Sequence, residues 1–452
     1  MRKKLRQNMH YYSALTKLAL PLIIGQLGLI VVGLADNMMV GHHNTNELAA
    51  ASFVNSIFSL ATLFGLGFSY GLTPLIGKFT GEKNYQKSGH ALRNSLIANG
   101  IFGIILTFII LVIYLNIDGM GQPIELLSYI RPYFLLQSAG LILIMLFNGF
   151  KQFFDGIGDA WQSMKVMLIA NIVNIIGNYA LIYGNWGFPE MGLNGAGIST
   201  LVSRILLPLL MAISFFIIPT YKEYRKGFST QKASLGDVMV LAKNGLPISF
   251  QIGLEASAFN LSAIMIGWVG ATALAAHQVM MGLTTLGYLI YYGLGSAITI
   301  LSSKYLGQNK NKEAVQVAHC GVHLILAWCL FLIPTLAISR NSIGLLFTNS
   351  QEVVELVALL VIPTLFYQVA DGIQIGYANA LRGIGDMKPM PYISFFSFFI
   401  VCLPVSYFMG IYLGWGAIGI WYGFPIALII AAFLFYGRYR YQTRQLLRMQ
   451  FS

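Results

Sequence analysis

Long apolar stretches, separated by short polar joins, run through the whole of the 452-residue chain. A helix that crosses a bilayer needs about 20 consecutive, mostly apolar residues. Twelve stretches reach that length, so the pattern predicts twelve membrane-spanning helices. They begin near Leu18, Ala50, Leu92, Leu127, Met164, Leu193, Leu246, Leu274, Val317, Leu356, Ile393 and Trp415.

Lys and Arg are distributed unevenly between the joins. Cytoplasmic joins of membrane proteins carry an excess of these residues. Here every second join is basic, beginning with the N-terminus, whereas the alternate joins hold little beyond Arg131 and Arg340. We therefore expect an even number of spans and two cytoplasmic termini. The basic joins contain Lys78, Lys83, Lys87, Lys151, Lys165, Lys222, Arg225, Lys304, Lys310, Arg382, Lys388, Arg438 and Arg440.

The second half of the chain repeats features of the first half. A shift of 226 residues aligns a proline, two glycines and a lysine without a gap, and a Gly-Ile-Gly-Asp motif recurs after a shift of 227. Transporters are often built from such duplicated bundles. The aligned pairs include Pro21 with Pro247, Gly41 with Gly267, Lys78 with Lys304, Gly81 with Gly307, and Gly156 to Asp159 with Gly383 to Asp386.

The repeat and the apolar pattern together predict the fold class and the domains. We expect an all-α membrane protein with twelve transmembrane helices in two six-helix bundles, related by pseudo-two-fold symmetry along the membrane normal. The longest polar break is charged, contains Ser and Gly, and lies at the middle of the chain. We therefore assign residues 1–222 to an N-lobe, residues 223–237 to a cytoplasmic linker and residues 238–452 to a C-lobe.

Composition excludes several classes of protein. The chain is 56% hydrophobic and 10% charged, whereas soluble domains are about a quarter charged. The formal net charge is +12, but the basic residues lie in the joins and so indicate topology, not nucleic-acid binding. Cys320, Cys329 and Cys402 lie in apolar segments and lack metal-ligand spacing. The sequence contains no phosphate-binding loop or HExxH motif, so we expect neither an enzyme nor an enzymatic cofactor.

Three acidic residues, Asp36, Glu255 and Asp371, lie inside apolar stretches. Each would cost about 2.5 to 3.5 kcal/mol at the bilayer centre, so it must face a cavity, pair with a base or bind a proton. Arg204 is the only deep base, and the helices of Glu255 and Asp371 offer these acids no Lys or Arg. A carboxylate without a fixed counter-ion suits Na⁺ or H⁺. The alternative is a structural acid, hydrogen-bonded to backbone or hydroxyl groups.

Polar side chains lie at helical spacing near these acids. Asn171, Asn174 and Asn178 share one face of the fifth span, at the depth of Asp36 and of Thr200. This arrangement predicts either a polar pocket or hydrogen bonds between helices.

In the second half, Tyr367 and Gln251 each lie one turn before an acid and could help to coordinate a cation. Aromatic and thioether side chains near the acids, among them Tyr288 and Met281, would suit lipophilic cations, although each could equally pack helices. His277 is either a helix-end residue or a proton relay.

These motifs resemble the multidrug and toxic compound extrusion (MATE) transporters, in their NorM-like branch. The resemblance extends over nearly the whole chain and includes the tandem halves and the two GIGD motifs. It is carried by LADNMMVG around Asp36, QIGLEA around Glu255, LAAHQ at 274–278 and YQVAD at 367–371. It implies export of organic cations, including drugs, in exchange for Na⁺ or H⁺.

The resemblance also implies roles for individual residues. Some members carry an aspartate where Asn178 stands, so the first-lobe pocket here has one acid fewer. We favour Na⁺ over H⁺, with Glu255 and Asp371 as its ligands, because two carboxylates with neutral oxygen donors suit a hard cation. The implied residues are Glu255, Asp371, Tyr367 and Asp36 for cation binding and coupling, and Asn174, Asn178 and Thr200 for an N-lobe polar network. Tyr288 matches an aromatic position at the cation site of related proteins. We expect Tyr288, Met281 and Gln278 to line the substrate cavity.

The expected protein is a monomeric antiporter of the bacterial inner membrane that works by alternating access. Its partners are the lipid bilayer and organic cations, with Na⁺ or H⁺ as the coupling ion. The alternative is a flippase for a lipid-linked substrate, which would need a broad basic cavity, whereas the deep residues here are mainly acidic. A channel would need rings of polar residues around a pore.

Overall fold

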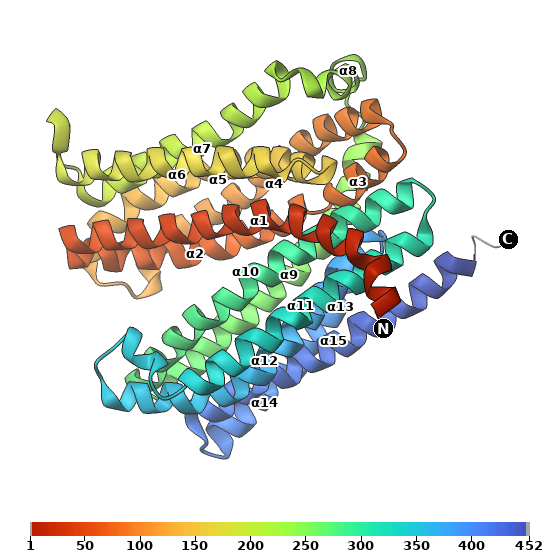
Figure 1. Ribbon diagram of the computed structural model, residues 1–452. Coiled ribbons are helices and arrows are strands. Elements are labelled where there is room, and N and C mark those ends of the chain that lie inside the picture. The colour runs from red at the N-terminus through yellow and green to blue at the C-terminus, as the bar shows by residue number, and fades with distance from the viewer. Residues whose placement is uncertain (1, 449–452) are drawn as a thin grey trace. The chain divides into compact units, whose positions relative to one another are not determined.

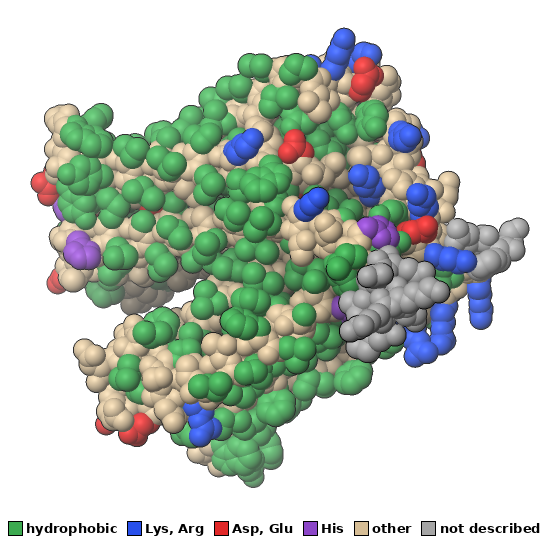
Figure 2. All heavy atoms as spheres, in the orientation of Figure 1, with side chains coloured by type: hydrophobic (Ala, Val, Ile, Leu, Met, Phe, Trp, Pro, Cys, Tyr) green, Lys and Arg blue, Asp and Glu red, His purple; other side chains and the backbone are tan. Residues whose placement is uncertain are grey.

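The computed structural model describes residues 2–448 and is helical almost throughout (Figure 1). The side chains of residues 2–7, which include the basic residues of the predicted N-terminal join, lie outside the described part. Among residues 2–448, no strand is present and twelve helical segments are long and apolar enough to cross a membrane. The predicted all-α membrane fold with twelve spans is therefore confirmed. Figure 2 shows hydrophobic side chains over most of the visible surface, as contact with acyl chains requires.

The first six spans lie between α1 and α7. The second span, Thr45–Gly81, consists of two helices because the chain turns at residues 70–72. The bounds are α1 (Arg2–His43), α2 (Thr45–Ser69), α3 (Thr73–Gly81), α4 (Tyr85–Leu115), α5 (Ile124–Ile157), α6 (Ala160–Tyr183) and α7 (Gly192–Ile217), followed by the short helix α8 (Lys222–Thr230).

The last six spans lie between α9 and α15. The eleventh span, Met390–Tyr412, is wound partly as π-helix, at Phe395–Cys402 and Phe408–Tyr412. α12 packs against both α10 and α15, and Figure 1 shows these helices side by side. The bounds are α9 (Leu235–Val269), α10 (Ala271–Gly307), α11 (Asn311–Ser339), α12 (Gln351–Gly383), α13 (Met390–Ser394), α14 (Leu403–Tyr407) and α15 (Gly416–Arg448).

The chain forms two compact units whose limits differ from those of the predicted lobes. One unit holds residues 24–249, and the other holds the residues up to Ile23 together with those from Phe250 onward. The two points of division are 226 residues apart (249 − 23), which is the shift that relates the two halves in sequence. Each unit therefore includes the N-terminal part of a long helix, α1 or α9, that the sequence assigned to the other half.

Glycines at equivalent positions accommodate these helix segments. A β-carbon at Gly67 of α2 would lie 2.7 Å from the Cα of Ser249 in α9. A β-carbon at Gly293 of α10 would clash with Cγ1 of Ile23 in α1. The shift of 226 relates Gly67 to Gly293 and Ile23 to Ser249. Both units thus contain the same close crossing of helices, at which a small residue lets the two helices approach.

Each Gly-Ile-Gly-Asp motif ends a long helix. Its second glycine, Gly158 or Gly385, has a φ of 92° or 84°, in the left-handed region that favours glycine after a helix. The aspartate that follows accepts a hydrogen bond from the end of its own half, at 2.6 Å from Tyr221 in the first half and at 2.6 Å from Arg438 in the second. The recurring motif is therefore a helix stop that also ties the end of each half in place.

Candidate functional site

The first-half candidates form one hydrogen-bonded chain inside the unit of residues 24–249. Asn178 donates to Oδ1 of Asp36 at 2.5 Å and to Oδ1 of Asn174 at 3.4 Å. Asn174 in turn donates to the hydroxyl of Thr200 at 3.3 Å. α6 presents both asparagines together because positions four apart share a helix face. The structure brings together all four residues that the sequence placed in this network.

The sequence identified Arg204 as a deep base but did not identify its partner. In the structure, Arg204 of α7 interacts electrostatically with Asp36 and donates to the backbone carbonyl of Gln137 at 3.2 Å. A β-carbon at Gly140 of α5 would lie 2.6 Å from Cδ of Arg204, so this glycine provides the space for the guanidinium. Asp36 therefore has a nearby positive charge, which sequence spacing across different helices could not reveal.

Several buried polar atoms around this network have hydrogen-bonding capacity left over. Among the described residues, Oδ1 of Asn178, Nδ2 of Asn171 and Oε1 of Gln137 have no hydrogen-bond partner. Buried polar groups are normally hydrogen-bonded, to protein or to ordered water. The left-over capacity favours a polar pocket over simple hydrogen bonding between helices, the two alternatives that the asparagine stripe left open.

The second-half candidates also meet within one unit. Glu255 of α9 and Asp371 of α12 are close enough for their charges to interact. Tyr367, one turn before Asp371, is buried and interacts electrostatically with both acids. Gln374, which the sequence did not single out, lies on the same helix and donates to Oε2 of Glu255 at 3.4 Å. The site thus combines two carboxylates with neutral oxygen-bearing side chains.

The structure corrects one statement about the charged neighbours of these acids and shows a partner for Gln251. Arg382 lies inside α12, the helix of Asp371, is 7% exposed and interacts electrostatically with Glu255. The sequence had placed it in a polar join, because it follows the apolar stretch by only a few residues. The amide oxygen of Gln251, which the sequence suggested as a cation ligand, accepts a hydrogen bond from Arg382 at 3.0 Å.

The residues predicted for the substrate cavity lie on α10. Gln278, Met281 and Tyr288 fall close to one face of this helix, at positions i, i+3 and i+10. Gln278 and Tyr288 are exposed, and Tyr288 interacts electrostatically with Tyr367 of the acidic site. His277 is buried, with its ring 5.6 Å from that of Trp421. Among the described residues, its Nδ1 has no hydrogen-bond partner, so this packing decides neither for a structural residue nor for a proton relay.

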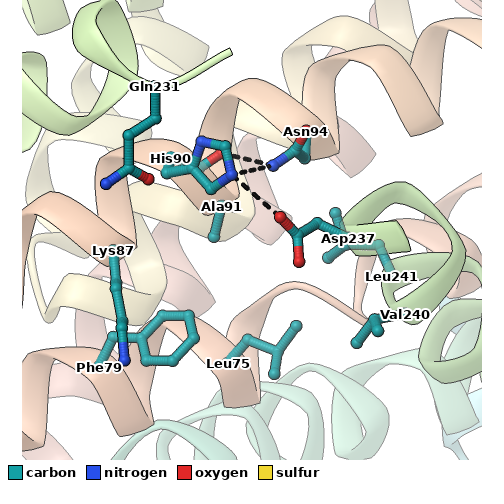
Figure 3. Close-up of a pocket in the computed structure, with 10 residues that line it drawn as sticks. All are labelled: Leu75, Phe79, Lys87, His90, Ala91, Asn94, Gln231, Asp237, Val240 and Leu241. Atoms are coloured by element: carbon teal, nitrogen blue, oxygen red, sulfur yellow. Dashed lines mark hydrogen bonds and ion pairs between the residues drawn. The ribbon is translucent and has the colours of Figure 1, made fainter. Parts of the chain in front are cut away.

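The segment predicted as a linker is folded against α4. Residues Lys222–Thr230 form α8, and a β-carbon at Gly227 would clash with the backbone of α4. Nε2 of His90 lies 3.0 Å from Oδ2 of Asp237, and Oδ1 of Asn94 accepts a hydrogen bond from the backbone of Ser234 at 3.0 Å. Figure 3 shows His90, Asn94 and Asp237 at the wall of a pocket. The volume of this pocket is about 350 Å³. The connector is thus tied to the first half at several points.

Within residues 2–448, no group of three or more His, Cys, Asp or Glu side chains is placed to hold a metal ion. A cation at Glu255 and Asp371 would therefore need neutral oxygens to complete its coordination, as Tyr367 and Gln374 could provide.

A family model described as MatE matches residues 21–180 and 247–408. The chain belongs to the MatE family. The two matched segments begin 226 residues apart (247 − 21), which confirms the internal repeat found in the sequence. The first segment contains Asp36 and both asparagines, and the second contains Glu255, Tyr367 and Asp371. Thr200 lies outside both.

Relatives and solved structures agree with this assignment over nearly the whole chain. The chain is 27% identical to the "Multidrug resistance protein MdtK" of Cronobacter sakazakii over 95% of both sequences. It is 29% identical to the "Probable multidrug resistance protein NorM" of Mannheimia succiniciproducens, over 95% of this chain and 94% of that one. The predicted NorM-like assignment is therefore confirmed.

The fold matches solved transporter structures. A crystal structure of "MATE in the bent conformation" superposes with a TM-score of 0.87 at 20% identity, over 97% of both chains. A transporter of the MOP superfamily from Pyrococcus furiosus superposes with a TM-score of 0.83 at 19% identity, over 96% of both chains, and its description reports a binding pocket of reverse polarity that suggests a different function. At these identities the likeness establishes the fold alone.

Proposed function

We propose that this MatE-family chain is a secondary antiporter that exports organic cations, including drugs, in exchange for Na⁺, by alternating access between two six-helix lobes. Membership of the family and the multidrug resistance proteins among its relatives support drug export. The alternating basic joins support a protein of the bacterial inner membrane with both termini in the cytoplasm. H⁺ is the alternative coupling ion.

The observation that carries this proposal is the pairing of Glu255 with Asp371 in the membrane-spanning part of one unit. Two carboxylates whose charges interact repel each other when both are ionised, so a Na⁺ bound between them reduces their repulsion and neutralises one of the two charges. Tyr367 and Gln374 supply neutral oxygens at the same place. Such a site suits a hard cation and favours Na⁺ over H⁺.

Coupling requires the two ligands to favour opposite states or to compete for the same groups. Na⁺ at Glu255 and Asp371 favours the outward-open state and weakens drug binding, and protonation of Asp36 acts in the same direction. An organic cation from the cytoplasmic side does the reverse. Each site has a base nearby, Arg204 for Asp36 and Arg382 for Glu255, but only the second-half site combines two acids, which makes it the stronger cation site.

The test is ethidium efflux from vesicles that contain the purified full-length chain, under an imposed Na⁺ or H⁺ gradient. We expect the Na⁺ gradient to drive efflux, and we expect Glu255→Gln and Asp371→Asn each to abolish that response. Glu352→Gln, at the start of the helix that carries Asp371, is the matched control and should export like the parent.

The possible results separate the parts of the proposal. Efflux driven by H⁺ alone would assign the coupling to protons. Unchanged export by both acid variants would contradict the assigned cation site. If neither gradient drives efflux, the antiporter itself is contradicted.

A flippase for a lipid-linked substrate is the second candidate, because a MOP-superfamily protein of the same fold is described as having a pocket of reverse polarity and a different function. An anionic headgroup would need exposed bases in the cavity. Here Arg204 lies near Asp36, and Arg382 donates to Gln251, so the deep bases are already engaged. Transfer of a fluorescent anionic lipid between leaflets, without ethidium efflux, would favour the flippase.

A further inference from the structure

A groove of about 390 Å³ runs between α12 and α15, away from the acidic site. Its lining is formed entirely by apolar and aromatic residues from these two helices. The main ones are Phe366, Val369 and Ile373 of α12 with Ile429, Phe433 and Tyr436 of α15.

The lining of the groove and the cation site occupy different faces of α12. Phe366, Val369 and Ile373 follow one another at intervals of three and four residues and therefore share a face. Asp371 lies two residues from both Val369 and Ile373, which is slightly more than half a turn of the helix. Its side chain therefore points to the opposite face of α12. An occupant of the groove would therefore contact the helix of the cation site without entering that site.

The rims of the groove are exposed. Phe433 is 71% exposed and Phe366 is 59% exposed, and both lie within membrane-spanning segments. Lipid acyl chains surround such segments, and they can fill an apolar groove whose empty space would otherwise leave its lining without contacts.

The lining face of α15 continues into basic residues. Arg440 lies one turn after Tyr436, and Arg444 lies one turn after Arg440, so all three share the face of Phe433. Arg440 and Arg444 are exposed. Arg438, two residues before Arg440, bonds Asp386 in the join that follows α12, so this part of α15 lies beside the end of α12. A tyrosine followed by arginines is the usual order from the hydrocarbon region to the phosphate level of a bilayer.

We propose that this groove binds an anionic phospholipid, with one acyl chain between α12 and α15 and the phosphate at Arg440. The apolar lining selects a hydrocarbon chain, and the guanidinium groups at its end select a negative headgroup over a neutral one. The site is distinct from the transport site, so the proposal does not depend on the direction or the coupling ion of transport.

The test is native mass spectrometry of the full chain in detergent, after addition of phosphatidylglycerol or phosphatidylcholine at equal concentration. The parent should retain phosphatidylglycerol in preference to phosphatidylcholine. Val369→Trp, which fills the groove, should remove the retained lipid. Arg440→Gln should lower the phosphatidylglycerol adduct about fivefold, which is the effect of one basic residue near a membrane surface, and should leave the phosphatidylcholine adduct unchanged.

Two control variants and a melting curve complete the experiment. Leu434→Trp places the same bulk on α15 outside the groove, and Arg448→Gln removes a charge further along the same helix; both should bind lipid like the parent. Equal melting temperatures exclude unfolding as the cause of a loss. Equal retention of both lipids by the parent would overturn the proposal. So would retention of phosphatidylglycerol at the parent's level by both Val369→Trp and Arg440→Gln. A dimer that Val369→Trp removes would overturn it too, by assigning the groove to a second copy of the chain.

Discussion

The crossing of α2 with α9 can be tested by adding one carbon atom. In the variant Gly67→Ala, the new β-carbon would lie 2.7 Å from the Cα of Ser249 and 3.0 Å from a backbone oxygen of Ile248. Backbone atoms cannot rotate away, so the two helices must separate. Overpacking of this kind costs about 1–3 kcal/mol, against a gain of about 0.5–1 kcal/mol for alanine over glycine in a helix. We expect the free energy of unfolding to fall by about 1–2 kcal/mol.

Denaturant unfolding of the detergent-solubilised chain, followed by circular dichroism, measures this loss. Gly33→Ala is the matched control, since its added carbon would have no atom outside its own stretch of helix within 4 Å, and it should be neutral or slightly stabilising. Gly293→Ala should cost less than Gly67→Ala, because its nearest contacts are side-chain atoms of Ile23, which can move, and the backbone oxygen of Ala19 is 3.1 Å away. If Gly67→Ala unfolds at the same denaturant concentration as Gly33→Ala, the close crossing is wrong.

Two further predictions concern ion pairs. Asp155→Ala should lower the free energy of unfolding by about 3–5 kcal/mol, since it removes the carboxylate that lies 2.7 Å from the buried ammonium group of Lys151. The double variant Lys151→Met/Asp155→Leu should recover most of this loss. Equal losses in the single and double variants would refute this reasoning. Asp237→Asn should lower the free energy of unfolding by at most about 1 kcal/mol, because Asp237 is half exposed. It should also speed amide hydrogen exchange in residues 231–237 by weakening the contact with His90. Unchanged exchange would show that this pair does not hold the connector.

Hydropathy and the repeat predicted the fold because both follow from properties that are local in sequence. A span is recognised by its own length and apolar content, whatever it packs against. The shift of 226 emerges from matched glycines and prolines, and the same number separates the two matched family segments and the two limits of the compact units. The limits themselves were not predicted, because the parts of α1 and α9 that belong to the other unit carry no polar break to mark them.

The charged contacts were predicted less completely. Lys151 and Arg382 were taken as topological markers because each is close to the end of an apolar stretch. α5 and α12 continue past these residues, however, and both side chains are buried. The proximity of Arg204 to Asp36 joins α7 to α1, and no spacing along one helix reports a contact between two helices. What periodicity could show was the shared face of Asn174 and Asn178.

The repeat also separates residues that maintain the fold from residues that are candidates for transport. The hydrogen bond of Thr73 to Gln152 at 2.7 Å recurs, after shifts of 226 and 227, as that of Thr299 to Asn379 at 3.2 Å. The close glycine crossings and both GIGD stops recur in the same way, as expected of contacts that any six-helix half requires.

The acids of the two candidate sites do not recur. The shift of 226 carries Asp36 to Ser262 and Glu255 to Leu29, and the shift of 227 carries Asp371 back to Ile144. The fold is duplicated but the buried acids are not, so the two halves cannot bind the same ion in the same way. Under the proposed function, the second half holds the cation between two acids, and the first half offers one acid near a base. The efflux assay should therefore distinguish Asp36→Asn from Glu255→Gln by their dependence on the Na⁺ gradient, and identical dependence would contradict a division of labour between the halves.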